Sequence, residues 1–302
     1  MRFTIFQDSR LGDREGIEDR VGYSYSRDVL LMTVADGMGG HLGGEVAAEI
    51  AITEITRRFQ NEARHKLKKP FDFLVSAIQS AHRAIVSHAV EQNLLECPRT
   101  TVVACIVQNG NAYWAHAGDS RLYLIRKGQV VARTTDHSRV QMLIDSGELT
   151  PEAAARHPER NKIFSCLGGV VPPQIATGRE FPLETGDTLV LSTDGFWAQI
   201  PGSILGSVLM KQPVVEVMPG LLEEAQRRAR GESDNLSVVA MTWESQDDAG
   251  VADTQQLEVG FTTSSNTTEQ LEGKGDGDAD VTEEDIERAI NEIQDAIRRV
   301  PR

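Results

Sequence analysis

The stretch Leu30-Leu31-Met32-Thr33-Val34-Ala35-Asp36-Gly37-Met38-Gly39-Gly40 joins an apolar run to an aspartate and then to a glycine-rich turn. The run is aliphatic and β-prone, which predicts a buried strand over residues 29–35. An aspartate at the end of a strand is held stiffly, and neighbouring glycines let a backbone or a ligand approach closely. Taken alone, however, an Asp-Gly pair also fits an ordinary turn, in which the carboxylate accepts hydrogen bonds from turn amides.

The charge of the chain is concentrated at its C-terminal end. Net charge is −14 over 302 residues, and residues 245–302 hold 15 Asp/Glu against 5 Lys/Arg, a net of −10. A nearly neutral body with an acidic tail argues against nucleic acid as the main ligand. The N-terminus has no signal-peptide core, and no apolar run approaches the roughly 18 residues that span a bilayer. We therefore expect a soluble, cytoplasmic protein that does not bind membranes.

Hydrophobic periodicity predicts a mixture of helices and strands. Helices are expected at 45–59, 71–91, 138–147, 204–210 and 214–228, and strands at 3–7, 21–26, 29–35, 100–107, 112–117, 122–125, 129–133, 174–181, 188–192 and 236–243. The tight turns Asn109-Gly110 and Lys127-Gly128 favour antiparallel pairing. The fold class expected is therefore α+β.

The C-terminal residues differ in composition from the rest. Residues 245–280 are rich in Gln, Asp, Gly, Ser and Thr, which predicts an acidic flexible linker. Residues 281–302 predict an amphipathic helix with one narrow apolar stripe. Two interpretations remain open for this helix, because the stripe suits either packing against the body of the protein or docking to a partner.

Several other acids lie at the ends of predicted strands. Asp194, before Gly195, follows an apolar strand as Asp36 does. Glu18 and Asp19 come just before one strand, Asp234 with Asn235 comes just before another, and Asp119 lies in Gly118-Asp119-Ser120-Arg121. If neighbouring strands bring these ends together, the carboxylates repel one another unless a cation neutralises them. No His or Cys accompanies them at ligand spacing, including Cys97, Cys105 and Cys166, which we interpret as free thiols. An all-oxygen site suits Mg²⁺ or Mn²⁺.

These motifs, together with Arg14, resemble the ordered motifs of the metal-dependent protein phosphatases (the PPM family, type 2C) over about residues 1–243. The short form Asp36-Gly37-Met38-Gly39-Gly40 is similar to the bacterial branch. The resemblance implies a four-layer α/β/β/α sandwich, in which two antiparallel sheets are flanked by helices. It places the phosphatase domain at 1–244, with a flap at about 138–169 that affects substrate choice. It implies hydrolysis of phosphoserine and phosphothreonine by a water held between two metal ions.

The resemblance to the family also implies which residues of this chain would bind the metal ions. Asp36 would bridge two Mn²⁺ or Mg²⁺ ions. Glu18 and the carbonyl of Gly37 would complete the shell of one ion, and Asp194 and Asp234 would hold the other. Each of these positions carries the residue type that the family's pattern requires.

The remaining roles follow from the same resemblance. Arg14 would bind the substrate phosphate, for which a planar guanidinium is suited. Asp119 would help Asp194 hold a third, weakly bound ion. Asp19 and Asn235 would support the ligands without touching metal. Phosphorylated proteins are the implied partners, with a Ser/Thr kinase among them. A non-catalytic phosphoprotein-binding scaffold with the same fold is the alternative, although it would be expected to have lost metal ligands.

One position departs from the family's pattern. Animal members have a histidine, thought to protonate the leaving group, where this chain has Met38. A thioether cannot donate a proton. Either a metal-bound water or His41 is left for this role, and we favour water because His41 suits capping or packing at the start of the following helix.

Met38→His therefore provides a test of leaving-group protonation. If water supplies the proton in the native protein, a titratable imidazole at this position changes the acidic limb of the pH–rate profile for a phosphate ester. The profile of kcat/KM is measured for the native and variant proteins. An acidic limb identical in both would show that this proton transfer does not limit the rate.

Overall fold

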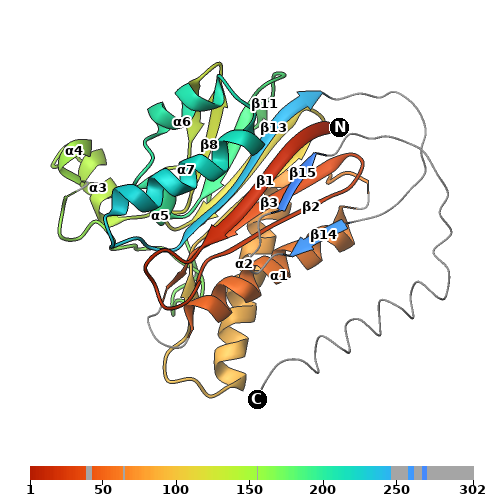
Figure 1. Ribbon diagram of the computed structural model, residues 1–302. Coiled ribbons are helices and arrows are strands. Elements are labelled where there is room, and N and C mark those ends of the chain that lie inside the picture. The colour runs from red at the N-terminus through yellow and green to blue at the C-terminus, as the bar shows by residue number, and fades with distance from the viewer. Residues whose placement is uncertain (39–42, 64, 155, 246–257, 262–266, 271–302) are drawn as a thin grey trace, which may run out of the picture. The chain divides into compact units, whose positions relative to one another are not determined.

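The computed structural model describes residues 1–38, 43–63, 65–154, 156–245, 258–261 and 267–270 (Figure 1). Within these ranges, every helix is too short or too polar to cross a membrane. The predicted terminal helix at 281–302 and most of the predicted linker at 245–280 lie outside the described residues, so both stay predictions. The linker range does contain two short described strands, β14 (Glu258–Phe261) and β15 (Thr267–Gln270).

The first of two large antiparallel sheets is built from both ends of the described chain. Its strands, in spatial order, are β15, β1 (Arg2–Arg10), β13 (Leu236–Ser245), β12 (Thr188–Ser192), β8 (Arg121–Arg126) and β9 (Gln129–Arg133). In this sheet Phe3 pairs with Trp243 and Arg10 with Leu236, so the N-terminal strand runs the full length of the last long strand.

The second large sheet is formed mainly by the middle of the chain. Its strands, in spatial order, are β10 (Ala176–Thr177), β7 (Asn111–Ala117), β6 (Val102–Gln108), β3 (Val29–Ala35), β2 (Arg20–Tyr25) and β14, and β11 (Phe181–Pro182) also pairs with β7. The strand predicted at 174–181 is thus broken. Gly178 lies at the break, where an added Cβ would overlap the ring of Trp114. A small third pair joins β4 (Gly37–Met38) to β5 (Arg99–Thr100).

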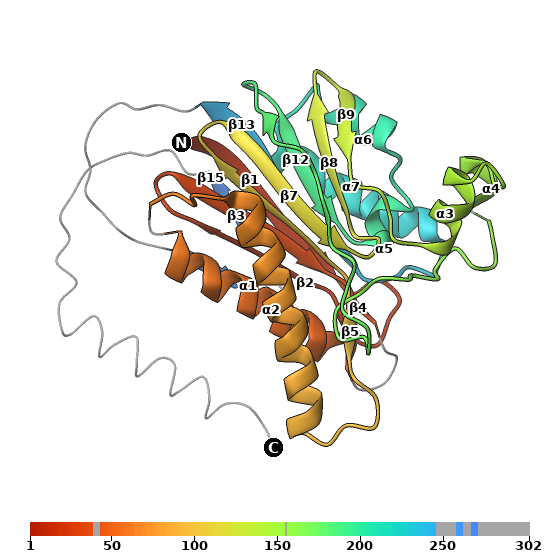
Figure 2. The same cartoon turned by 180° about the vertical axis from the view of Figure 1, so that it is seen from behind.

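Helices cover the outer face of each large sheet (Figures 1 and 2). The helices of the described residues are α1 (Gly44–Glu62), α2 (Pro70–Glu91), α3 (Arg139–Asp145), α4 (Pro151–Ala154), α5 (Asp194–Trp197), α6 (Gly202–Leu209) and α7 (Val214–Ala229). Of these, α3 and α4 pack on each other to one side of the sheets (Figures 1 and 2). The pair α1 and α2 packs on the second sheet, and α5 to α7 pack on the first. The predicted α+β class with two antiparallel sheets is confirmed. The structure adds α5, which begins at Asp194 where the sequence suggested a turn.

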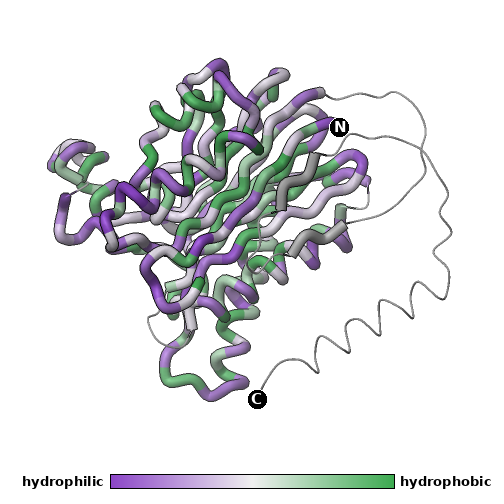
Figure 3. The backbone as a smooth tube through the Cα atoms, in the orientation of Figure 1, coloured by the Kyte–Doolittle hydropathy of each residue, from purple (hydrophilic) through white to green (hydrophobic). Residues whose placement is uncertain are grey.

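Strand β3 is buried on both of its faces. Leu31 belongs to the cluster between the second sheet and the helices α1 and α2. Leu30, Met32 and Val34 point to the other side and pack between the two sheets, beside Val239 of the first sheet. Successive side chains of a strand alternate between faces, so a strand covered on both sides must be apolar throughout. Figure 3 shows the resulting hydrophobic stretches along the central strands.

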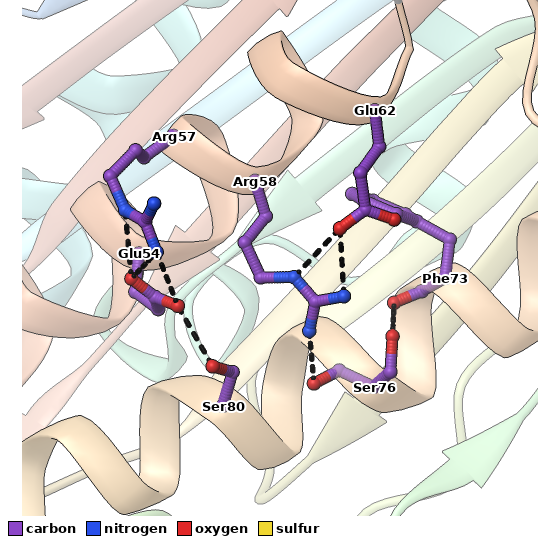
Figure 4. Close-up of polar contacts among 7 residues, drawn as sticks. All are labelled: Glu54, Arg57, Arg58, Glu62, Phe73, Ser76 and Ser80. Atoms are coloured by element: carbon purple, nitrogen blue, oxygen red, sulfur yellow. Dashed lines mark hydrogen bonds and ion pairs between the residues drawn. The ribbon is translucent and has the colours of Figure 1, made fainter.

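Polar contacts fix α1 against α2 (Figure 4). The hydroxyl of Ser80 donates to Glu54 Oε1 at 2.8 Å, and Glu54 also accepts from Arg57. Arg58 donates to the carbonyl of Ser76 at 2.8 Å. These contacts set the position of α1 over the second sheet. They therefore also set the position of its first residue, Gly44, which lies at the candidate site described below.

Ile55→Ala tests the packing of α1. Ile55 is fully buried in the cluster under the helices, whereas Val46 on the same helix is 37% exposed. Removing the buried side chain should lower the free energy of unfolding by about 2–5 kcal/mol. The matched change Val46→Ala should alter it by less than about 0.5 kcal/mol. Urea unfolding of both variants measures the difference, and equal losses would contradict this account of the core.

Candidate functional site

The strand registers bring the ends of both sheets to one end of the domain. In the first sheet, Ser192 pairs with Arg121 on one side and Val238 on the other. In the second sheet, Ala35 pairs with Arg20. The connections β1–β2 and β7–β8 cross from one sheet to the other at this end. The loops that hold Glu18, Asp36, Asp119, Asp194 and Asp234 therefore all lie at the same end of the sandwich, near the labels α5, β4 and β5 in Figure 2.

The backbone of Asp36 is fixed by the segment between β5 and β6. Its amide donates to Thr101 Oγ1 at 3.1 Å. Its carbonyl accepts from the Thr101 amide and from the Thr100 hydroxyl, both at 2.9 Å. Both backbone groups of Asp36 are therefore held in place, and the residue is half-buried at the edge of the sheet.

Glycine is required at two positions where three backbones meet. A Cβ on Gly37 would overlap the backbone of Gly44 and the carbonyl of Glu18. A Cβ on Gly44 would overlap the carboxylate of Glu18. The Glu18 carboxylate therefore lies against the first residue of α1, where the helix dipole favours a negative charge. Gly44 is a site residue that the sequence reasoning missed, because a glycine at a helix start carries no signal of the acid beside it.

Asn235 holds the loop that carries Arg14 and Glu18. Its Nδ2 donates to the carbonyls of Leu11 at 2.8 Å and Gly16 at 3.0 Å. Its Oδ1 accepts from the Glu18 amide at 2.8 Å. The side chain is buried, so these hydrogen bonds are shielded from water. Asn235 thus links the start of β13 to the β1–β2 loop and positions the acid at its end.

Arg14 is paired with one of the predicted ligands. Its guanidinium donates to Asp234 Oδ2 at 2.7 Å, while Asp234 Oδ1 accepts from the Asn235 amide at 2.9 Å. The pair is open to solvent, with side chains 60% and 39% exposed. The sequence predicts that Arg14 binds the substrate phosphate, and this role stays a prediction; in the structure its guanidinium contacts Asp234. The two are far apart in sequence, so their pairing left no local signal.

Asp19 is nearly fully buried where the two sheets meet. It is 3% exposed, and the hydroxyl of Thr193 donates to its Oδ2 at 2.8 Å. The same hydroxyl accepts from the Ser237 amide at 3.0 Å. Thr193 therefore connects the start of β2 to the end of β12 and to β13. Asp19 is therefore held at the junction of the two sheets, and its supporting role at the site stays a prediction.

Asp119 is also buried, at 5% exposure, in the turn between β7 and β8. The hydroxyl of the next residue, Ser120, lies 2.7 Å from Thr101 Oγ1. The carbonyl of Asp119 accepts from the indole of Trp197 at 3.0 Å. Thr101 thus joins the Asp119 turn to Asp36, and Trp197 joins it to the helix that begins at Asp194. Both connecting residues were missed at the sequence level.

The acids interact strongly with one another. Burial raises the pKa of Asp36 well above its usual value, and Asp19, Asp194, Asp119 and Asp234 raise it further. Burial likewise raises the pKa of Asp119 well above its usual value, with Asp194 adding to the rise. It raises the pKa of Asp194 to about 6 and that of Asp19 to about 7. Buried carboxylates that repel one another favour either protons or a cation.

The donor set fits a hard divalent cation. The gathered side chains offer carboxylate oxygens, with backbone carbonyls nearby, and such ligands suit Mg²⁺ or Mn²⁺. Within the described residues, however, no three Asp, Glu, His or Cys side chains surround one point as a metal shell does. A shell would need the carboxylates to turn toward a common centre. Asp234 in particular would have to share or leave its contact with Arg14.

His41 lies outside the described residues, and its role stays a prediction. His137, which contacts the Asp119 turn, makes structural contacts: its Nδ1 accepts from the Gly118 amide at 3.3 Å, and its ring stacks on His116 with centroids 4.7 Å apart. Met38 is half-buried in the short strand β4, one residue beyond Gly37.

A surface cavity of about 460 Å³ lies away from the acids. It is lined by the opposite ends of the strands that carry the site, including Arg126, Thr188 and Thr242. Those ends are paired in the same ladders as Arg121 and Ser192, several residues further along. The cavity is therefore separate from the acidic end of the sandwich.

Two antiparallel sheets, covered by helices and carrying clustered carboxylates at one shared end, define a metal-dependent phosphatase. A family model described as Protein phosphatase 2C matches residues 7–238. The chain therefore belongs to the protein phosphatase 2C family, which confirms the predicted resemblance.

Individual relatives support this assignment. A putative protein phosphatase 2C-type of Streptococcus pyogenes serotype M6 is 32% identical over 226 residues, covering 74% of this chain and 90% of that protein. The serine/threonine protein phosphatase PstP of Mycobacterium tuberculosis is 31% identical over 276 residues, covering 90% of this chain and 49% of PstP, so this chain spans about half of that relative. The solved catalytic domain of PstP, in complex with two manganese ions, matches with a TM-score of 0.66 and 30% identity, covering 80% of this chain and 100% of that domain.

The raised pKa values predict how pH affects the metal-free protein. The folded-state pKa of Asp19 is about 7, against 3.8 for the free side chain, so its stabilising proton is fully present below pH 3.8 and is lost as pH rises through 7. Asp194 adds to the effect near pH 6. The free energy of unfolding should therefore fall between about pH 5 and pH 7.5, and Mn²⁺ should restore it most at the higher pH.

Urea unfolding at both pH values, with and without Mn²⁺, measures this effect. Asp19→Asn serves as the control, because removing one titrating group should reduce the pH dependence. A stability that rises from pH 5 to pH 7.5 without metal would contradict the account of the buried acids.

Proposed function

We propose that the acidic end of the sandwich is the active centre at which this protein hydrolyses phosphoserine and phosphothreonine in other proteins. The chain is a metal-dependent protein serine/threonine phosphatase of the bacterial branch of its family. The observation that carries the proposal is the gathering of Asp36, Asp119 and Asp194, whose mutual repulsion calls for a cation.

The proposed ligands follow the positions of these side chains. Asp36 would be shared between two ions, because acids of both sheets influence it. Glu18 and the Gly37 carbonyl would hold one ion with it, and Asp194 and Asp234 would hold the other. When bound, the two ions lower the pKa of a water molecule and orient it for in-line attack on phosphorus. We further propose that Asp119 and Asp194 would together hold a third ion, which binds more weakly than the other two.

The ions proposed are Mn²⁺ or Mg²⁺. Support comes from the oxygen-only donors and from the two manganese ions in the solved PstP domain. Asp19 and Asn235 contribute by holding their neighbours: the first accepts from Thr193, and the second fixes the loop of Glu18. Their oxygen and nitrogen atoms are already occupied by these contacts, which suits a supporting role rather than direct ligation.

Arg14 is proposed to bind the substrate phosphate. Its side chain is 60% exposed, so an incoming phosphate can reach it. A phosphate dianion competes with the Asp234 carboxylate for the same guanidinium, and a bidentate contact favours the phosphate. Transfer of Arg14 from Asp234 to the substrate would also free one oxygen of Asp234. In this way, binding of the substrate phosphate would be linked to binding of the metal ion by Asp234.

Proposed partners are phosphorylated proteins, including targets of a Ser/Thr kinase whose signal this phosphatase reverses. The names of the bacterial relatives as serine/threonine phosphatases support the substrate class. The C-terminal segment 281–302, outside the described residues, is proposed as a helix that docks a partner. A non-catalytic scaffold is disfavoured, since each acid that the family's pattern requires is present.

Loss of metal or of Asp36 tests the proposal directly. Hydrolysis of a generic phosphate monoester should require Mn²⁺ or Mg²⁺, should stop with EDTA, and should fall at least about 100-fold in Asp36→Asn. Asp72→Asn is the matched control, because Asp72 lies on α2 with its side chain 70% exposed. Turnover that survives EDTA, or an equal loss in both variants, would contradict the proposal.

A further inference from the structure

Asp119 and Asp194 lie just beyond the paired ends of β8 and β12, two neighbouring strands of the first sheet. Asp119 lies in the turn that leads into β8, and Asp194 is the first residue of α5, after β12. Among the charged groups that shift the pKa of Asp119, Asp194 has the largest effect and raises it. Ladder hydrogen bonds between β8 and β12 end at Arg121 and Ser192, so they do not extend to either acid. The separation of the two carboxylates must be set by contacts beyond the sheet.

Trp197 supplies such a contact. It is the last residue of the four-residue helix α5 and lies one turn from Asp194, so the two side chains move with the same short segment. Its indole Nε1 donates to the carbonyl of Asp119 at 3.0 Å. Phe196, which precedes it, is fully buried and anchors the helix to the core. The indole therefore connects the segment of one acid to the backbone of the other.

Arg121 fixes the plane of this indole. The centre of its guanidinium lies 3.4 Å from the centroid of the Trp197 ring, a cation–π contact. The guanidinium is itself held by Asp136, with Nε to Oδ1 at 2.8 Å and Nη2 to Oδ2 at 2.7 Å. Both side chains of this ion pair are largely buried, 14% and 6% exposed. A half-buried indole, which could otherwise change rotamer, is thereby kept in the orientation that reaches Asp119.

We propose that Trp197, held by Arg121, is a positioning residue that sets the separation of the Asp119 and Asp194 carboxylates and thereby the affinity of the cation they share. The proposal rests on the proposed function, because it takes these two acids as ligands of one ion. Neither Trp197 nor Arg121 is assigned contact with substrate or metal. They act on the site through the backbone of Asp119.

The chain contains a matched control for Arg121. At the other end of the same strand, Arg126 makes the same kind of bidentate pair, with Asp187 at 2.9 and 2.6 Å. It also lies over an aromatic ring, Phe181, at 5.4 Å. Arg126→Lys therefore removes an equivalent fork and ring contact far from the acids. A purely structural role for Arg121 predicts similar effects from the two lysine substitutions.

The test is calorimetric titration of metal-free protein with Mn²⁺, together with kcat and KM for a small phosphate ester. Trp197→Phe keeps a ring but removes the N–H donor, and Arg121→Lys keeps the charge but removes the fork. Each should weaken the weakest Mn²⁺-binding step about tenfold and lower kcat at limiting Mn²⁺ with KM for the ester unchanged. Arg126→Lys should leave the binding isotherm unchanged. Because Trp197 and Arg121 act through one contact, the double variant should bind Mn²⁺ no more weakly than the single variant with the lower affinity.

One further variant separates the possible outcomes. Asp119→Asn should weaken the same binding step. If it does so while Trp197→Phe binds Mn²⁺ like the native protein, the positioning role is overturned and the assignment of the acids stands. If Asp119→Asn itself has no effect, both are overturned. Should Arg121→Lys fail to fold, as judged by its unfolding midpoint, Trp197→Phe alone decides the question.

Discussion

Repulsion between carboxylates gathered at one end of two sheets is the constraint on which the arrangement of this protein depends. Asp36, Asp119, Asp194 and Asp19 each have a raised pKa because they are removed from water and placed near one another. Such a cluster opposes folding unless the rest of the structure over-determines it. The fully buried strand β3 and the three largest clusters of buried hydrophobic side chains provide the stability that offsets this local cost.

Hydrogen bonds to uncharged side chains, rather than ion pairs, hold most of these acids in place. Thr101 fixes the backbone of Asp36, Asn235 fixes the loop of Glu18, and Thr193 donates to Asp19. Neutral donors orient an acid without cancelling its charge, so the negative potential of the site is kept for a cation. Among the described residues assigned to the site, Arg14 is the cationic side chain in contact with an acid, and that contact is exposed to solvent. An exposed pair is weak and easily exchanged.

Sequence and structure agree where the information is local or periodic. The apolar run before Asp36, the helical repeat after Gly44, and the strand before Asp194 place these elements correctly. The family motifs then bring the acids to one end. Contacts between a side chain and a distant backbone were not predictable, because they leave no period in the sequence. The bonds from Asn235 to Leu11 and from Trp197 to the Asp119 carbonyl are of this kind. The ion pair between Arg14 and Asp234 escaped prediction for the same reason.

The pairing of β1 with β13 has a consequence for the order in which the protein can assemble. Strand β1 pairs along its whole length, from Arg2 to Arg10, with a strand that ends at Ser245. Contacts of such long sequence separation form late and slow the folding of the chain. Asp234 and Asn235 lie immediately before β13, so the loop of Glu18 has no clamp until that strand has emerged. A partly synthesised chain therefore lacks an assembled acidic centre, and phosphatase activity can begin only after β13 has joined the sheet.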